Sequence, residues 1–444
     1  ATWEGSEAYF SGNHKVGITV QEQGSLAILR DVVVRNTKTI QNGSWGRGLS
    51  IERGAKAQGH KVMISNNHEY GLYVGNPGTE IDLQDVTVIG TNPSGPDYFA
   101  DGVKLQDGAK VRLERVSIES NAGIGLSAGE ATEVVLIDAR LGNNYAPEDV
   151  ISGIGLVTLD GAQLELSRVD VFENFLVGMA VRGANTDVRA TDLVVRGTIP
   201  GVAGILGWGV LVDTGASLDV KRGNLTSNRE KGLMVSGADT RVSLDEVLVN
   251  DTQSSRVGLL GRGVQVQDRA AIVAQSLQVV GNRETGIFVM DQDTYFEAKD
   301  LIVKETKEAF CAMSEQLQCP YIGGFGDGMV VLGGASVSLE DFSITENART
   351  GMYLVVADGT EFAENVTQPV LGTPHFDGQE GEIINNQYDV TMKGVELDSD
   401  GIEVEGLACF DNESTVDGCT SQVDLTIPSP SKEIEGLIGK EIDD

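Results

Sequence analysis

Apolar and polar residues alternate along most of this chain in short runs, which are separated by glycine, asparagine or aspartate. A glycine followed by apolar-x-apolar recurs thirteen times, at Gly17, Gly48, Gly71, Gly102, Gly125, Gly155, Gly178, Gly209, Gly232, Gly263, Gly286, Gly328 and Gly351. The spacings alternate between 23 and about 31 residues, apart from one step of 42. Fixed spacing of this kind indicates a repeat architecture, whose unit is a short and a long coil together.

Each coil contains three runs of period two, as in "GVKLQDGAKVRLERVSIESN" (102–121) and "GLVTLDGAQLELSRVDVFEN" (155–174). Period two predicts strands whose alternate side chains face one core. Three short strands cannot bury a core alone, whereas stacked coils can. The pattern therefore predicts an all-β solenoid of about 13 coils of parallel strands. The residue two after each glycine should point outward, in a column that is polar early and mostly apolar from Val157 onward.

An asparagine stands four residues before alternate glycines, as in Asn13/Gly17, Asn121/Gly125 and Asn228/Gly232. This Asn-x-x-x-Gly-apolar-x-apolar pattern resembles that of right-handed parallel β-helix repeat proteins of the pectate-lyase-like superfamily, from residue 9 to about 360. The resemblance implies a right-handed parallel β-helix but no single activity, because that fold carries lyases, hydrolases, epimerases, adhesins and structural proteins. We expect these asparagines to close turns in left-handed backbone. Lying in every second coil, they should not form a contiguous ladder.

The repeat suggests four segments. Residues 1–16 are a partial coil or an N-terminal cap, and residues 17–360 are the parallel β-helix. The pattern then decays, and residues 361–427 are predicted to form a β-rich C-terminal cap, because a solenoid must hide its open strand edges. Residues 428–444 are a tail or a docking helix.

The long coils place their extra residues before alternate glycines, so these inserts should form one row of loops, where function often concentrates. Each insert has Gly or Ala two places before the anchor glycine, which suggests close backbone approach or positive φ. Three places before it stand mostly large residues, such as Trp45 and Phe325, which are expected to pack each loop down. Candidate binding residues, suited to a sugar ring or a protein partner, are Tyr73, Tyr98, Phe99, Lys104, Tyr145 and Trp208. Ordinary loop packing is the alternative.

The chain is strongly acidic, with 66 Asp and Glu against 33 Lys and Arg and a net charge of -33. Such a surface disfavours nucleic acid and anionic lipid as partners. No apolar run approaches 18 residues, so no membrane span is expected. The charge fits solubility in an extracellular or salty medium.

Four cysteines form two local pairs, Cys311 with Cys319 and Cys409 with Cys419. Because neither spacing suits zinc, two short-loop disulfides are expected, and four free buried thiols are the alternative. Disulfides imply an extracellular, periplasmic or cell-surface location. Anchoring through a segment that precedes Ala1 would fit, since the repeat is already under way there.

The sequence contains few candidates for catalytic or metal-binding residues. The predicted outward column contains no Asp or Glu, and Asp101 and Asp327 fall eight coils apart, too far for an acid/base pair. The four histidines are scattered and suggest no metal cluster. Residues 93–101 and 398–406 hold oxygen ligands at short spacing and are candidates for structural calcium. No other cofactor is indicated.

Two functions fit these observations. The first is an exported, non-catalytic β-helix that displays a row of loops for binding a glycan or a surface protein, for adhesion or for cell-surface organisation. The alternative is a carbohydrate-active enzyme, a polysaccharide lyase or glycoside hydrolase, with its site in the long loops. Three or more charged side chains that converge between neighbouring coils would favour the enzyme.

Overall fold

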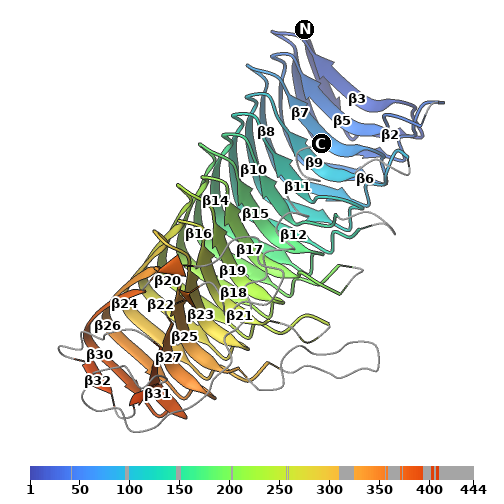
Figure 1. The fold of residues 1–444 in the computed structure, drawn as a ribbon. Coiled ribbons are helices and arrows are strands. Elements are labelled where there is room, and N and C mark those ends of the chain that lie inside the picture. Colours follow the sequence, from blue (N-terminus) through green and yellow to red (C-terminus); the bar gives the residue numbers. More distant parts are fainter. Residues whose placement is uncertain are drawn as a thin grey trace. The chain divides into compact units, whose positions relative to one another are not determined.

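The computed structural model describes residues 1–41, 43–95, 100–146, 152–201, 204–256, 258, 260–309, 325–355, 357–358, 371–372, 374–393, 402–404 and 407–409. Its contacts divide the chain into two compact units, Ala1–Asn228 and Arg229–Asp444. Every regular element in the described residues is a β-strand (Figure 1). This confirms the all-β prediction.

Unit 1 contains two parallel sheets whose strands alternate along the chain. One sheet consists mainly of ten-residue strands, in the order β1 (Thr2–Ser6), β4 (Leu26–Arg35), β6 (Lys56–Ser65), β8 (Glu80–Ile89), β10 (Lys110–Glu119), β12 (Glu133–Gly142), β14 (Gln163–Phe172), β16 (Asp187–Arg196) and β18 (Ser217–Thr226), with β2 (Tyr9–Ser11) beside β4. The short-strand sheet follows the order β3 (Val16–Gln21), β5 (Arg47–Glu52), β7 (Tyr70–Gly75), β9 (Asp101–Leu105), β11 (Leu126–Ala128), β13 (Leu156–Thr158), β15 (Val177–Arg182) and β17 (Trp208–Asp213).

Unit 2 repeats the arrangement. Its long-strand sheet has the order β20 (Arg241–Asn250), β22 (Ala271–Val280), β24 (Tyr295–Lys304), β26 (Ser336–Thr345), β30 (His375–Ile384) and β32 (Ile402–Val404). The short-strand sheet has the order β19 (Lys231–Ser236), β21 (Arg262–Gln267), β23 (Thr285–Met290), β25 (Asp327–Leu332), β27 (Thr350–Val355), β31 (Tyr388–Lys393) and β33 (Leu407–Cys409). One antiparallel pair, β28 (Ala357–Asp358) and β29 (Leu371–Gly372), lies outside these sheets.

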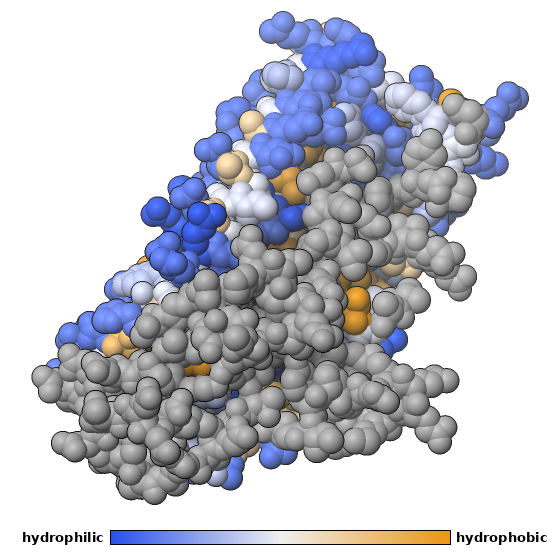
Figure 2. All heavy atoms as spheres, viewed as in Figure 1, coloured by the Kyte–Doolittle hydropathy of each residue, from blue (hydrophilic) through white to orange (hydrophobic). Residues whose placement is uncertain are grey.

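Each ten-residue strand bends at its sixth residue, where φ lies between 52° and 58°. A coil therefore has three straight runs, one short strand and the two halves of a long one, as the period-two pattern predicts. In unit 1 the residues at this bend alternate in charge and pair between neighbouring coils: Asp31 with Lys61, Asp85 with Arg115, Asp138 with Arg168, and Asp192 with Arg222. The part of the surface that the structure describes is mainly hydrophilic in the view of Figure 2, in agreement with these exposed pairs.

The recurring glycines are required by space rather than by backbone conformation. A Cβ atom at Gly71 would lie 2.5 Å from Val88 Cγ1 and 2.6 Å from the carbonyl oxygen of Gly102, although φ at Gly71 is ordinary. The residues one and three after it, Leu72 and Val74, are fully buried in the core. The glycine is thus the point at which the backbone of one coil packs directly against the next.

A buried ladder of side-chain amides corrects the expectation for the asparagines. Asn121 Nδ2 donates to Asn144 Oδ1 at 3.0 Å, and Asn144 Nδ2 donates to Asn174 Oδ1 at 2.8 Å, so successive coils do form a contiguous ladder here. In other coils a threonine stands in place of the asparagine. The backbone amide of Thr91, for example, donates to Asn121 Oδ1. Positive φ belongs to the preceding residue, as at Ser120, and not to the asparagine. The asparagines are selected by buried hydrogen bonding.

Candidate functional site

The outer face of the short-strand sheet in unit 1 carries polar and aromatic side chains in two rows. Strand pairing places Ser50, Tyr73, Lys104 and Ser127 side by side across β5, β7, β9 and β11. A second row, one residue before the anchor glycines, holds Arg47, Tyr70 and Asp101. The two rows lie on the same side of the sheet, because the guanidinium of Arg47 lies 4.0 Å from the ring centre of Tyr73. This is the outer side, since Leu72 and Val74 of β7 point into the core.

Asp101 is the carboxyl of this face whose pKa is most perturbed. Its side chain is only 4% exposed and its Oδ1 accepts the amide hydrogen of Ile124 at 3.4 Å. Burial raises the pKa of this carboxyl from 3.8 to about 6, and the nearby ammonium of Lys104 opposes the rise. A carboxyl with this pKa exchanges its proton near neutral pH, as a general acid or base must.

Lys104 supplies a cation next to this carboxyl. Its Nζ donates to Ser127 Oγ at 3.0 Å, and the side chain is half-buried. In the part of the chain that the structure describes, no carboxylate forms an ion pair with Lys104 within 4.0 Å. The ammonium is therefore positioned by a neutral hydroxyl and keeps its charge available for an anionic group.

Tyr70 and Tyr73 form an aromatic pair beside these charges. Their rings stack with centroids 5.6 Å apart and planes at 26°. Burial raises the pKa of both phenols above the ordinary value, and the charge of Arg47 opposes the rise at each. Both hydroxyls therefore stay protonated at neutral pH and can donate hydrogen bonds.

Arg47 is held from two sides. Its Nε and Nη2 donate to the two carboxylate oxygens of Glu69 at 3.1 and 3.3 Å, and Nη1 lies 3.6 Å from Glu52 Oε1. A bidentate pair of this kind fixes the plane of the guanidinium. Trp45 lies on the same cation, with its ring centre 4.5 Å away, as expected for a residue that packs its loop down.

Two further carboxyls, Asp107 and Glu130, lie at the turns that follow β9 and β11. Asp107 accepts a hydrogen bond from Gln106 Nε2 at 3.1 Å and one from Asn76 Nδ2 at 3.3 Å. A hydrogen bond between Asp107 and Glu130 lowers the pKa of Asp107 and raises that of Glu130. The pair therefore retains a proton to higher pH than isolated carboxyls do.

The predicted site residues are dispersed. Tyr73 and Lys104 come together in this cluster, while Tyr145 lies after β12 and is 38% exposed. Trp208 begins β17 and is fully buried, so its ring is not offered to a ligand in this structure. Tyr98 and Phe99 lie outside the described residues. So do Cys311, Cys319 and Cys419, and only the backbone of Cys409 is described.

The sequence pattern missed Arg47, Glu69 and Tyr70 as site residues and dismissed Asp101. The reason is that only the column two after each anchor glycine was expected to face outward. The residue before the glycine faces outward as well, because the glycine packs inward and breaks the strict alternation. The sequence did contain a signal, because the residue before the anchor glycine differs between long coils, as in Arg47, Asp101 and Trp208.

Metal binding is not indicated by the described side chains. Among them, no group of three or more His, Cys, Asp or Glu is arranged to hold an ion. Both calcium candidates, 93–101 and 398–406, fall partly outside the described residues, so structural calcium stays a prediction. The same part of the chain contains no apolar helix of membrane-spanning length.

Comparison with known proteins identifies the fold. A family model described as a right handed beta helix region matches residues 85–249. The chain is a right-handed parallel β-helix. No curated protein matches its sequence significantly.

Several solved structures resemble this chain at low identity. A periplasmic alginate epimerase is 9% identical, with 87% of this chain and 77% of that chain covered and a TM-score of 0.43. A mannuronic acid specific polysaccharide family 6 lyase enzyme from human gut microbiota is 10% identical, with 98% and 94% covered and a TM-score of 0.37. An Azotobacter vinelandii mannuronan C-5 epimerase module is 11% identical, with 88% and 92% covered and a TM-score of 0.23.

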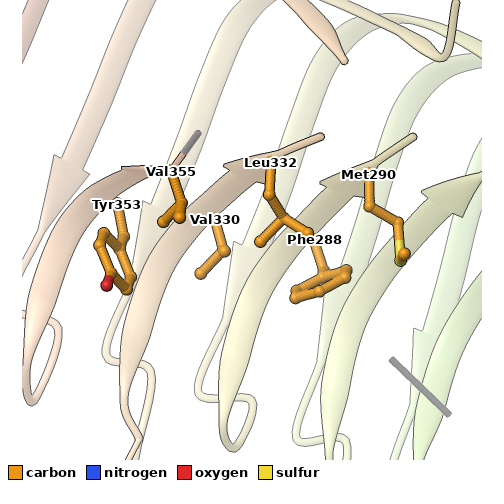
Figure 3. Packing of buried hydrophobic residues seen from close by; sticks show 6 residues of the cluster. All are labelled: Phe288, Met290, Val330, Leu332, Tyr353 and Val355. Atoms are coloured by element: carbon orange, nitrogen blue, oxygen red, sulfur yellow. The ribbon is translucent and has the colours of Figure 1, made fainter. Parts of the chain in front are cut away.

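At β23, β25 and β27 of unit 2, the outer face of the short-strand sheet is apolar, unlike the outer face of β5, β7 and β9 in unit 1. Phe288, Met290, Val330, Leu332, Tyr353 and Val355 project from β23, β25 and β27 to the same side and are fully buried (Figure 3). Beside them Arg262 Nη2 donates to Glu284 Oε1 at 2.8 Å, and its guanidinium lies 3.8 Å from the ring centre of Phe288. The predicted apolar outward column is thus present, and this face offers packing rather than exposed chemistry.

Proposed function

We propose that this β-helix is a carbohydrate-active enzyme whose site is the outer face of β5, β7 and β9 in unit 1. The observation that carries the proposal is Asp101, a buried carboxyl with a pKa of about 6, beside the ammonium of Lys104 and the Tyr70–Tyr73 stack. A perturbed carboxyl, a cation and an aromatic platform on one rigid face are a constellation for acting on a sugar.

The chemistry divides among these groups. Asp101 takes or gives a proton, Lys104 stabilises negative charge that develops on the substrate, and the tyrosines provide a surface for the sugar ring and phenolic donors for its hydroxyls. Hydrolysis needs a second free carboxylate at a set distance. The nearby Glu69 is bound to Arg47 through both oxygens, and Asp107 and Glu130 are hydrogen-bonded to each other. The elimination catalysed by a lyase, which needs one base and a stabilised carbanion, is therefore favoured over hydrolysis.

Non-catalytic display is the second candidate, and the low exposure of the site favours it. Asp101 and Tyr73 are only 4% and 8% exposed, so a polymer cannot reach them without some movement of their surroundings. In that case the long loops would bind a glycan or a surface protein, and Asp101 would have no reaction to perform. Both candidates fit an extracellular or periplasmic location, where polymeric sugars are found.

A polysaccharide panel separates the candidates. Uronate and neutral polymers are incubated with the protein, and products are followed by ultraviolet absorbance of a new double bond and by reducing ends. A lyase gives both signals, and a hydrolase gives reducing ends alone. Asp101→Asn should abolish turnover, while Asp82→Asn, an exposed carboxyl on the long-strand sheet of the same unit, should leave it unchanged. Saturable binding of a polymer without turnover would support display and refute the enzyme.

A further inference from the structure

Tyr73 lies over a glycine that leaves room for its ring. A Cβ atom at Gly75 would be 2.7 Å from the phenol oxygen of Tyr73 and 3.0 Å from its Cζ. The backbone at Gly75 is not left-handed, so the glycine is needed for space and not for conformation. Any larger residue at this position would push the ring off its own strand.

Other neighbours of the ring of Tyr73 are cationic and aromatic. The guanidinium of Arg47 lies 4.0 Å from the ring centre, and Tyr70 stacks against it. Arg47 is itself fixed by Glu69 and Glu52. The ring is thus confined by contacts from β5 and from its own strand β7, which limits its rotamers.

The same sheet contains a glycine in an equivalent place without this contact. Both Val74 and Ala128 pair with Leu105, so Gly75 and Gly129, which follow them, stand at the same level of the sheet. A Cβ atom at Gly129 would meet only Leu159 Cβ, at 3.9 Å, which is an ordinary contact. Gly75 therefore has a role that its counterpart lacks.

We propose that Gly75 and Arg47 are positioning residues, which hold the Tyr73 phenol flat on the sheet where it contacts the sugar. This rests on the proposed function for the identity of the ligand. Because the three atoms nearest to a Cβ at Gly75 all belong to Tyr73, a change there should affect how a sugar binds and leave the proton transfer intact.

The test compares Gly75→Ala with Gly129→Ala, with Tyr73→Phe and Arg47→Lys as references. Near-ultraviolet circular dichroism reports the Tyr70–Tyr73 stack without any substrate. Gly75→Ala and Arg47→Lys should change this signal, since a lysine cannot both bridge Glu69 and lie flat on the ring, whereas Gly129→Ala should not. Thermal melts should be alike for the two alanine variants, because the contact at Gly75 is with the far end of a side chain.

On whichever polymer of the panel the wild-type protein degrades, Gly75→Ala should raise KM by about threefold to tenfold, the value of one aromatic contact, and leave kcat within about twofold. A Gly75→Ala variant with unchanged dichroism and unchanged KM would overturn the proposal. If the wild-type protein degrades no polymer, the dichroism still decides the positioning, and only the proposed function fails.

Discussion

Asp101 offers the sharpest test of the candidate site, because its carboxylate is buried. When this carboxylate is ionised, it should lower the stability of the folded state. Replacing it by asparagine keeps the size and the oxygen that accepts the Ile124 amide hydrogen, and removes the charge. We expect Asp101→Asn to be more stable than the wild-type protein at neutral and alkaline pH. A residue that lowers stability at its working pH is typical of a site kept for function.

The size of the expected difference in stability follows from the pKa shift of Asp101. A rise from 3.8 to about 6 corresponds to roughly 3 kcal/mol of unfavourable free energy in the ionised state, at about 1.4 kcal/mol per pKa unit. The folded state holds the proton more tightly than the unfolded state, so stability decreases as pH rises from about 4 to about 6 and is then constant. Below about pH 4 the carboxyl is neutral in both states and the penalty is absent.

Urea unfolding curves of both proteins at about pH 4 and about pH 8 measure this difference. The two proteins should coincide at the lower pH, and the asparagine variant should unfold at higher urea at the upper pH. Equal midpoints at both values would show that Asp101 is not desolvated in solution. A variant that is less stable at the upper pH would mean that the ionised carboxylate is stabilised, and the argument for a proton-exchanging group would fail.

Three further substitutions test the scaffold by chemical denaturation. Asn144→Ala should lower stability by roughly 1–3 kcal/mol, because it leaves buried amide partners of the ladder unsatisfied. Trp208→Ala should lower it by roughly 3–5 kcal/mol through the cavity left by a fully buried ring. Glu284→Ala should cost roughly 3–5 kcal/mol by leaving Arg262 buried without this partner, whereas replacing both by apolar residues should restore most of the loss.

The fold was predictable from the sequence because the sequence is a repeat. The period-two runs depend on local backbone geometry, and the anchor glycines depend on close packing between coils. Both recur at nearly fixed spacing, so the sequence shows them directly. The ladder was mispredicted because hydrogen bonding between coils depends on which residues stack, and Asn144 has no glycine four residues after it. A threonine such as Thr91 enters the same ladder through its backbone amide, which no side-chain pattern can show.

The site was only partly predictable, for a related reason. Tyr73 and Lys104 were identified because they stand two after their glycines, where alternation places outward side chains. Asp101 and Arg47 stand before the glycine, and only the packing of that glycine against the next coil shows that they face the same way. Burial then sets the pKa of Asp101, and burial depends on contacts from residues distant in the sequence.

The contacts of Arg47 with Glu69 and with the ring of Tyr73 also show which features belong to the scaffold and which to the site. In unit 1 Arg47 pairs with a glutamate 22 residues later and stacks on an aromatic ring 26 residues later. In unit 2 Arg262 does the same with Glu284 and Phe288, at identical offsets. An arrangement that recurs at a fixed offset is a property of the repeat, so Arg47 and Glu69 need no catalytic role to explain them. Asp327 stands in unit 2 where Asp101 stands in unit 1, but Arg349 Nε donates to Asp327 at 2.6 Å. What unit 1 adds is the phenol hydroxyl of Tyr73, the ammonium of Lys104 and an aspartate that accepts a backbone amide hydrogen instead. Those three groups are where a reaction should be sought.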